Sequence, residues 1–181
     1  MFEGTKSIDW SCFKQAHGDA SHVPDAIKAL VSDDESTREK AYWKLDNFVV
    51  LQSDLYEAAF YVIPFLVEIL LSKVFSGREH VYALLSEIAN GYAPDSVTIQ
   101  VDGNDMPLTL ACRTLVLEHV DVYLDEVKDI QSGYRDSALD LLGSLNEKSG
   151  DIRAALENVL ITEKDLEIKV LIKEVLEEFD G

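Results

Sequence analysis

The sequence predicts an all-α fold, an α-solenoid of about four helix pairs that forms a single domain over residues 1–181. Three observations predict it: apolar residues recur at helical spacing, two short signatures repeat in a fixed order, and turn-forming residues separate the segments. The 47% apolar content and the length of 181 residues suit one globular domain with a sizeable core.

The first signature is a basic residue followed by apolar residues three, seven and ten positions later. These offsets place the apolar members on one stripe of an α-helix, so each occurrence predicts the core-facing side of one helix. The four occurrences are Arg38/Ala41/Leu45/Phe48, Arg78/Val81/Leu85/Ile88, Arg135/Ala138/Leu142/Leu145 and Lys169/Ile172/Leu176/Phe179.

The second signature is an aliphatic residue or methionine followed by proline, at Val23-Pro24, Ile63-Pro64 and Met106-Pro107. Because the missing N–H of proline has no intrahelical partner in the first turn, we interpret each proline as a helix start. The first two prolines each precede the basic residue of the first signature by 14 positions, which gives a period of 40 residues. That period is typical of a helix–turn–helix repeat of HEAT length.

The expected helices, in order, cover residues 23–31, 36–52, 56–74, 77–91, 107–128, 133–147, 151–161 and 165–179, with turn residues between them. In the third pair, the first helix is expected to continue through Leu117, Val120 and Leu124. The fourth pair lacks the proline, as an atypical terminal repeat of a solenoid would. Residues 94–106 are an insertion, expected as an extended loop or a short hairpin, because residues 97–101 show β-branched alternation.

The charge is strongly negative, with 34 acidic and 16 basic side chains, a net charge of -18 and an isoelectric point near 4.4. Residues 91–181 hold 20 acids and eight bases, so the C-terminal half carries most of the excess. Such a field repels nucleic acid and anionic lipid and accelerates the encounter with cationic partners. We therefore expect a basic protein as the partner, and neither nucleic acid nor a membrane.

The sequence shows no clear pattern for a metal site, a cofactor site or a targeting segment. Cys12 and Cys112 lie far apart without a CxxC motif, which predicts two buried thiols and no zinc site. His17 and His22 lack the four-residue spacing that puts two ligands on one helical face, so we expect no metal and no other cofactor. No secretory signal is visible, and the most apolar stretch, 58–71, is too short to span a bilayer, so the expected location is the cytoplasm.

A series of residues in the first half of the chain carries a family resemblance. They are Asp9-Trp10, Ala16-His17-Gly18, Val23-Pro24, Leu30, Ser32, Arg38, Ala41, Leu45, Gln52, Tyr56-Glu57-Ala58, Ile63-Pro64-Phe65-Leu66, Leu85, Ile88 and Gly91. With them the chain resembles the small bacterial HEAT-repeat proteins, some of which stand beside polymorphic or contact-dependent toxins as immunity proteins. The resemblance implies a protein-binding α-solenoid, and we transfer no binding residue from the family.

The resemblance also implies that the second helix of each pair lines a concave surface. On those helices, the positions one, five, eight and twelve after the basic residue lie opposite the apolar stripe. The predicted partner-binding residues are Glu39, Trp43, Asp46, Glu79, Asp136, Asp140, Glu147, Glu174 and Glu177. Trp43 is the one large aromatic among them, with Tyr42 or Tyr82 as further candidate anchors. The alternative is a solvated acidic face with Trp43 packed on a neighbouring helix.

These observations favour a binding protein that is not an enzyme: an immunity protein that neutralises a cognate basic toxin, for example a nuclease, through an acidic surface. A general adaptor that binds a peptide or protein along the groove is the first alternative. A hydrolase or lyase using the carboxylates of Asp136 and Asp140 is the second, although the chain has no Walker loop, GxGxxG or GxSxG motif. A DNA glycosylase of HEAT-like fold would need a basic face, whereas this one is acidic. The oligomeric state stays open.

Overall fold

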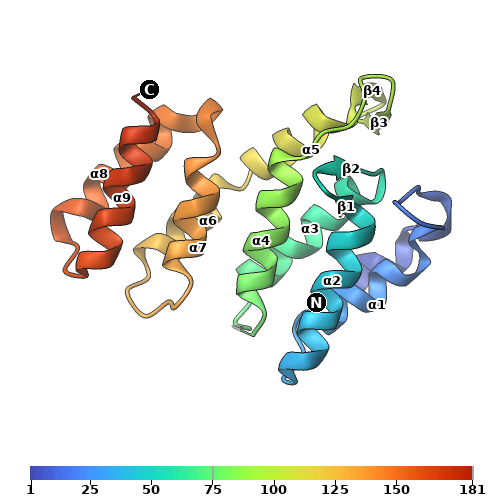
Figure 1. The fold of residues 1–181 in the computed structure, drawn as a ribbon, viewed down its shortest axis with the longest axis horizontal. Helices are drawn as coiled ribbons and strands as arrows, with labels where there is room; N and C mark the ends of the chain where they lie inside the picture. The colour runs from blue at the N-terminus through green and yellow to red at the C-terminus, as the bar shows by residue number, and fades with distance from the viewer. Residues whose placement is uncertain (75, 181) are drawn as a thin grey trace. The chain divides into compact units, whose positions relative to one another are not determined.

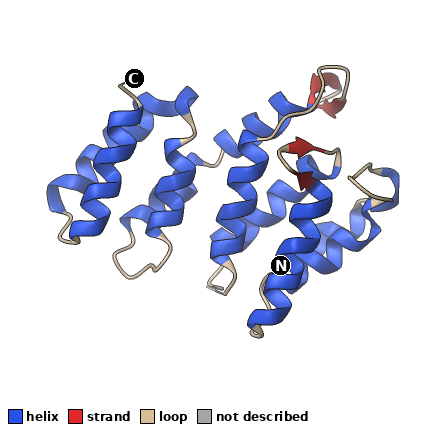
Figure 2. Ribbon diagram, viewed as in Figure 1, coloured by secondary structure: helices blue, strands red, loops and turns tan. Residues whose placement is uncertain are grey.

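The structure, a computed structural model, describes residues 1–74 and 76–180. Over these residues the chain forms nine α-helices and four short strands (Figures 1 and 2), which confirms the mostly helical prediction. The chain divides into two compact units, one from Met1 to Val116 and one that begins at Leu117, and each is described by itself. The single domain stays a prediction. Among the described residues, no helix has the length and apolarity that crossing a membrane requires.

Unit 1 (Met1–Val116) contains two helix pairs. Three 3-10 turns, η1 (Glu3–Ser7), η2 (Trp10–Cys12) and η3 (Ala20–His22), precede α1 (Val23–Ala29), α2 (Glu35–Val49), α3 (Ala58–Leu71) and α4 (Arg78–Asn90). In each pair the second helix packs on the first, and in addition α1 packs on α3 and α2 packs on α4 (Figure 1). The apolar stripes of both pairs therefore meet in one core, in which Leu45, Leu66 and Leu85 are fully buried.

Two short antiparallel hairpins interrupt the helices of unit 1. Of the two alternatives expected for the 94–106 insertion, an extended loop or a short hairpin, the hairpin is present, as β3 (Thr98–Val101) and β4 (Asn104–Pro107), with Asp102 and Gly103 at positive φ in its turn. It leads into α5 (Leu108–Leu117). A second hairpin, β1 (Val50–Leu51) with β2 (Asp54–Leu55), was not expected, because residues 50–52 were assigned to a helix. Backbone hydrogen bonds join Ser53 and Leu55 to Tyr92, so a distant segment holds this one extended.

Unit 2 repeats the arrangement with α6 (Val120–Lys128), α7 (Arg135–Gly143), α8 (Ser149–Thr162) and α9 (Leu166–Glu178), and with a 3-10 turn, η4 (Asn146–Lys148), between the pairs. The helices α6 and α7 pack together, as do α8 and α9. The first helices, α6 and α8, also pack on each other, and so do the second helices, α7 and α9. Each unit thus has a side made by its second helices.

Two further helix predictions are wrong. The expected helix 107–128 is two helices, because α5 ends at Leu117 and α6 begins at Val120. The buried residues Cys112, Val116 and Val120 keep an unbroken helical spacing across the break, so the sequence gives no sign of it. Pro64 does not start a helix, since α3 begins six residues earlier at Ala58. Pro64 lies on the exposed side of α3, so the hydrogen bond that its missing N–H cannot make is lost outside the buried core.

The basic residue of the first signature has a structural role. Arg38 donates to the carbonyl oxygens of Ser32 and Asp33 at 2.9 and 3.2 Å, just after α1. Arg78 donates to the carbonyls of Leu70, Ser72 and Val74 at 2.9–3.0 Å, at the end of α3. In both pairs the arginine therefore satisfies backbone carbonyl groups at the end of the preceding helix or in the turn that follows it.

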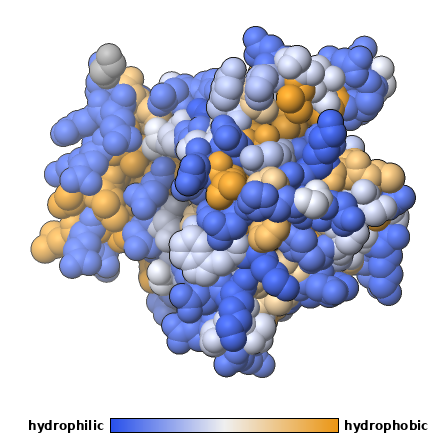
Figure 3. Space-filling model, turned by 45° about the vertical axis from the view of Figure 1, so that its right-hand side comes forward, coloured by the Kyte–Doolittle hydropathy of each residue, from blue (hydrophilic) through white to orange (hydrophobic). Residues whose placement is uncertain are grey.

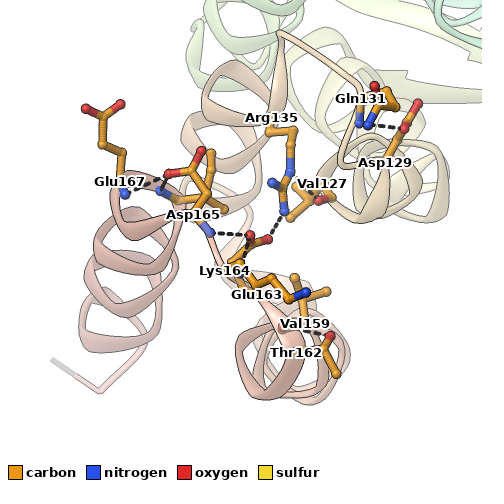
Figure 4. Close-up of polar contacts among 11 residues, drawn as sticks. Val127, Asp129, Gln131, Arg135, Val159, Thr162, Glu163, Lys164, Asp165 and Glu167 are labelled. Atoms are coloured by element: carbon orange, nitrogen blue, oxygen red, sulfur yellow. Dashed lines mark hydrogen bonds and ion pairs between the residues drawn. The ribbon is translucent and has the colours of Figure 1, made fainter.

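Arg135 extends this role into an ion pair between the two pairs of unit 2. Its Nε donates to the carbonyl of Val127 at 2.7 Å, and its Nη2 contacts the carboxylate of Glu163 in the turn before α9 (Figure 4). The other oxygen of Glu163 accepts from the backbone N–H groups of Lys164 and Asp165 at 2.7 and 2.8 Å. The Arg135 hydrogen bond, with help from these N–H groups, lowers the pKa of Glu163 to about 2.

Candidate functional site

The predicted binding residues lie on two surfaces. The α2/α4 face of unit 1 carries Glu39, Trp43, Asp46 and Glu79, and the α7/α9 face of unit 2 carries Asp136, Asp140, Glu174 and Glu177. Each face belongs to two helices that pack on one another, so residues distant in sequence share one surface.

The position predicted for Glu147 is wrong. We expected it on the second helix of the third pair, but α7 ends at Gly143 and Glu147 lies in η4. The backbone of Leu145 has left the helical region, with φ of -97° and ψ of 61°, and this turns the chain away before Glu147. Glu147 is exposed, but it does not belong to the α7/α9 face.

On the α2/α4 face, the acids differ in their surroundings. Glu39 is exposed, whereas Asp46 is half-buried. Glu79 lies 4.0 Å from Nε of Arg38 and 3.8 Å from Nε2 of His80, so its charge is partly compensated within the chain. Only Glu39 and Asp46 of the three offer a carboxylate that no cation of the described residues neutralises.

An aromatic cluster joins α2 to α4. The ring of Tyr42 stacks on His80 with centroids 5.1 Å apart, and Trp43 meets Tyr42 edge-on at 4.9 Å. Trp43 is 51% exposed, so about half of its surface faces solvent. Tyr82 is only 1% exposed, and its candidacy as an anchor is therefore wrong, because it is a core residue.

Burial tunes the polar groups of this cluster. Desolvation raises the pKa of Asp46, although the Tyr42 hydroxyl donates to it at 3.4 Å. Desolvation, together with the charges of Asp46 and Glu87, raises the pKa of Tyr42 to about 12. Tyr42 is therefore a protonated donor at neutral pH, and Asp46 is a carboxylate that has lost water without gaining a cation.

The α7/α9 face contains a narrow cleft of about 140 Å³. It is lined by the apolar side chains of Leu139, Leu171 and Val175, by Gly143, and by the acids Asp140, Glu174 and Glu178. Gly143 leaves room for the carboxylate of Glu178, since a Cβ there would lie 2.9 Å from its Oε2. Burial raises the pKa of Asp140, and the neighbouring Asp136 raises it further.

A second cleft of about 270 Å³ lies at the other end of the same helices. Asp136, Asp165 and Glu167 line it. Sequence reasoning missed Glu167 and Glu178 because it selected only residues directly opposite the apolar stripe, whereas these two stand on the flank of α9 that faces α7. Glu177 is exposed but lines neither of these clefts.

Unit 2 has little positive charge left for these carboxylates. From residue 117 onward the sequence holds 17 acids and seven bases, a net charge of -10. Four of the bases are already paired: Lys128 with Asp125, Arg135 with Glu163, Lys148 with Asp151, and Arg153 with Glu157 and Asp180. Asp140, Glu174 and Glu178 have no ion pair among the described residues.

Apolar side chains also reach the surface of unit 2. Ile161, Leu166 and Val170 of the α8–α9 pair are 80%, 74% and 53% exposed. Figure 3 shows such apolar groups among the hydrophilic side chains that dominate the visible face.

The two cysteines differ, against the expectation that both are buried. Cys112 is buried, and burial raises the pKa of its thiol to about 12. Cys12 is exposed and donates to Asp9 at 3.3 Å, a hydrogen bond that raises its pKa. Within the described residues, no group of three histidine, cysteine or acidic side chains is placed to hold a metal ion.

Comparison with protein-family models, with curated proteins and with solved structures finds no match for the chain.

Proposed function

We propose that this chain is a protein-binding module without enzymatic activity, an immunity protein that captures and neutralises a cognate basic toxin. The α7/α9 face carries the proposal. There Asp140, Glu174 and Glu178 line a cleft together with three apolar side chains, and none of these acids has an ion pair among the described residues. Such a surface offers both charge and apolar contact to a lysine or arginine side chain.

The net charge supports the choice of partner. A protein that acts on nucleic acid carries a basic surface, because it must neutralise phosphates. The -10 charge of unit 2 would attract such a surface over several ångströms of solution and raise the association rate, more so at low salt. Binding there would cover the surface that the toxin needs for its substrate.

The proposal includes a continuous solenoid of four HEAT-like pairs, α1/α2, α3/α4, α6/α7 and α8/α9, in one cytoplasmic domain. Its support is that both units follow the same rule: first helix packs on first helix, and second on second. The resemblance of the first half of the chain to small bacterial HEAT-repeat proteins points the same way.

The test is whether this chain binds and neutralises any protein encoded beside its gene, a basic one in particular. We expect a tight complex whose affinity falls with salt, and protection of cells that produce the neighbouring protein. The double variant Asp140→Asn/Glu174→Gln should weaken binding by about tenfold or more, since each lost charge-assisted contact contributes about 1 kcal/mol or more.

The matched control is Glu118→Gln/Asp121→Asn, which removes the same charge from exposed positions at a different groove of unit 2. It should change the affinity by less than about threefold, through the long-range field alone. The proposal fails if no product of the neighbouring genes is bound or neutralised by the unmodified protein.

A further inference from the structure

We propose that the α2/α4 face binds an arginine side chain of the protein partner, with the guanidinium lying on the exposed ring of Trp43 and its N–H groups reaching Glu39 and Asp46. The inference rests on the proposed function for its partner and adds which residue type the partner presents to unit 1. The proposed arginine site is a second contact with the partner, on a different surface from the α7/α9 face.

The Trp43 ring is exposed and held in place. It is 51% exposed, whereas the other tryptophan, Trp10, is 4% exposed in the core. Tyr42 supports one side of the indole, and His80 in turn stacks on Tyr42. An indole face is the best aromatic partner for a cation, and among the described residues no lysine or arginine of this chain occupies it.

Two carboxylates flank this ring along α2. Glu39 stands four residues before Trp43 and Asp46 three residues after it, so each lies one helical turn from the indole on the same side of the helix. Lys40 also lies one turn from Trp43, on the flank opposite to Asp46, where it neighbours Asp34, and Lys44 neighbours His22. A cation resting on the ring would therefore find an acid at both ends.

Asp46 is the stronger of the two partners. It is half-buried, accepts a hydrogen bond from Tyr42, and has no cation among the described residues. Much of its hydration is already lost in the folded chain, so an incoming guanidinium removes less water than it would from an exposed acid. The raised pKa of Asp46 is consistent with a carboxylate that lacks a positive neighbour.

Arginine fits this arrangement better than lysine. The guanidinium is flat, stacks on an aromatic ring and directs five N–H donors outward in its plane, so one group can contact the indole and the acids together. A lysine ammonium is a compact, strongly hydrated charge that cannot do both at once. The site therefore predicts a preference for arginine beyond what charge alone would give.

The experiment uses the full chain and an acetylated, amidated hexaarginine peptide as the probe, with hexalysine for comparison. Binding is followed at the indole N–H signal of Trp43 in ¹⁵N-labelled protein, which Trp43→Phe identifies. We expect hexaarginine to shift this signal and hexalysine to need a concentration several-fold higher for the same shift. The Trp10 signal, from an indole that donates to the Thr5 carbonyl at 2.9 Å, should stay in place and reports that the fold is intact.

Asp46→Asn should raise the half-saturating hexaarginine concentration at Trp43 by about three- to tenfold. The control Asp95→Asn removes one charge from an exposed loop position of unit 1 and should change it by less than about twofold. Because Asp46 is half-buried, the exposed Glu39→Gln provides a second variant, with an expected change of about two- to fivefold. An unmoved Trp43 signal, equal affinity for the two peptides at Trp43, or equal effects of Asp46→Asn and Asp95→Asn would overturn the inference.

Binding of the neighbouring basic protein to Trp43→Ala tests the arginine site and the proposed function separately. If the neighbouring basic protein binds and Trp43→Ala weakens it about three- to thirtyfold, both stand. If that protein binds with the same affinity to Trp43→Ala, the arginine site is refuted and the function stands. If no neighbouring product binds while hexaarginine still shifts Trp43 as expected, the function is refuted and the site stands.

Discussion

Glu163→Gln tests the buried ion pair that links the two helix pairs of unit 2. The side chains of Arg135 and Glu163 are 6% and 4% exposed, so neither charge can turn to water when its partner is removed. Glutamine keeps the size and one acceptor oxygen but leaves the guanidinium of Arg135 uncompensated. Breaking a buried pair in this way costs about 3–5 kcal/mol. We expect a loss near the lower end, about 3 kcal/mol, because the amide oxygen can still accept from the start of α9.

Thermal unfolding followed by circular dichroism at 222 nm measures this loss. For a chain of this size, about 3 kcal/mol corresponds to a Tm lowered by about 6–12 °C. Glu157→Gln is the matched control, since its pair with Arg153 is 3.9 Å long and Glu157 is 58% exposed. Its effect should stay below about 1 kcal/mol. Equal Tm values for the two variants would refute the argument that burial makes the Arg135–Glu163 pair different.

Three further predictions follow from individual groups. The pKa of Glu163 is about 2 in the folded chain against an ordinary 4.5, so its contribution to the free energy of unfolding is complete above pH 4.5 and disappears as the pH falls toward 2. Urea titrations should therefore show that the stability difference between the wild type and Glu163→Gln shrinks in that window. A difference that stays constant over this pH range contradicts the prediction. Gly77→Ala should lower the free energy of unfolding by more than about 2 kcal/mol, since Gly77 has φ of +82° and a Cβ would lie 2.0 Å from the Leu30 carbonyl oxygen. Gly18→Ala, at φ +73° but with open space around the added Cβ, should cost about 1 kcal/mol in the same unfolding assay. With a thiol-specific chromogenic reagent, Cys12 should react in the folded protein and Cys112 only on unfolding, and equal rates for both would be inconsistent with their different burial.

The α2/α4 and α7/α9 faces were only partly predictable. Helical spacing placed Glu39, Trp43, Asp140 and Glu174 on exposed sides of helices, because the side opposite an apolar stripe faces solvent in any packed helix. The cleft between α7 and α9 could not be found this way, since its lining comes from the flanks of two helices. Which flank faces the neighbour depends on how the helices pack, and in the folded chain the carboxylate of Glu178 lies beside Gly143, whose missing side chain leaves it room.

The sequence by itself determined where most helices form, where one hairpin interrupts them, and which side of each helix is buried. Those features depend on contacts between residues a few positions apart, so the spacing of apolar residues, prolines and turn residues records them. Only the tertiary structure decided that α5 and α6 separate, that residues 50–55 form a hairpin against Tyr92, and that Tyr82 is buried while Trp43 is exposed. It also decided that the recurring arginines bind the ends of preceding helices and that Arg135 meets Glu163, 28 residues away. Apart from the exposure of Trp43, which helical spacing favoured, these outcomes depend on which distant backbone and side-chain groups come together in the folded chain, and no local spacing specifies them.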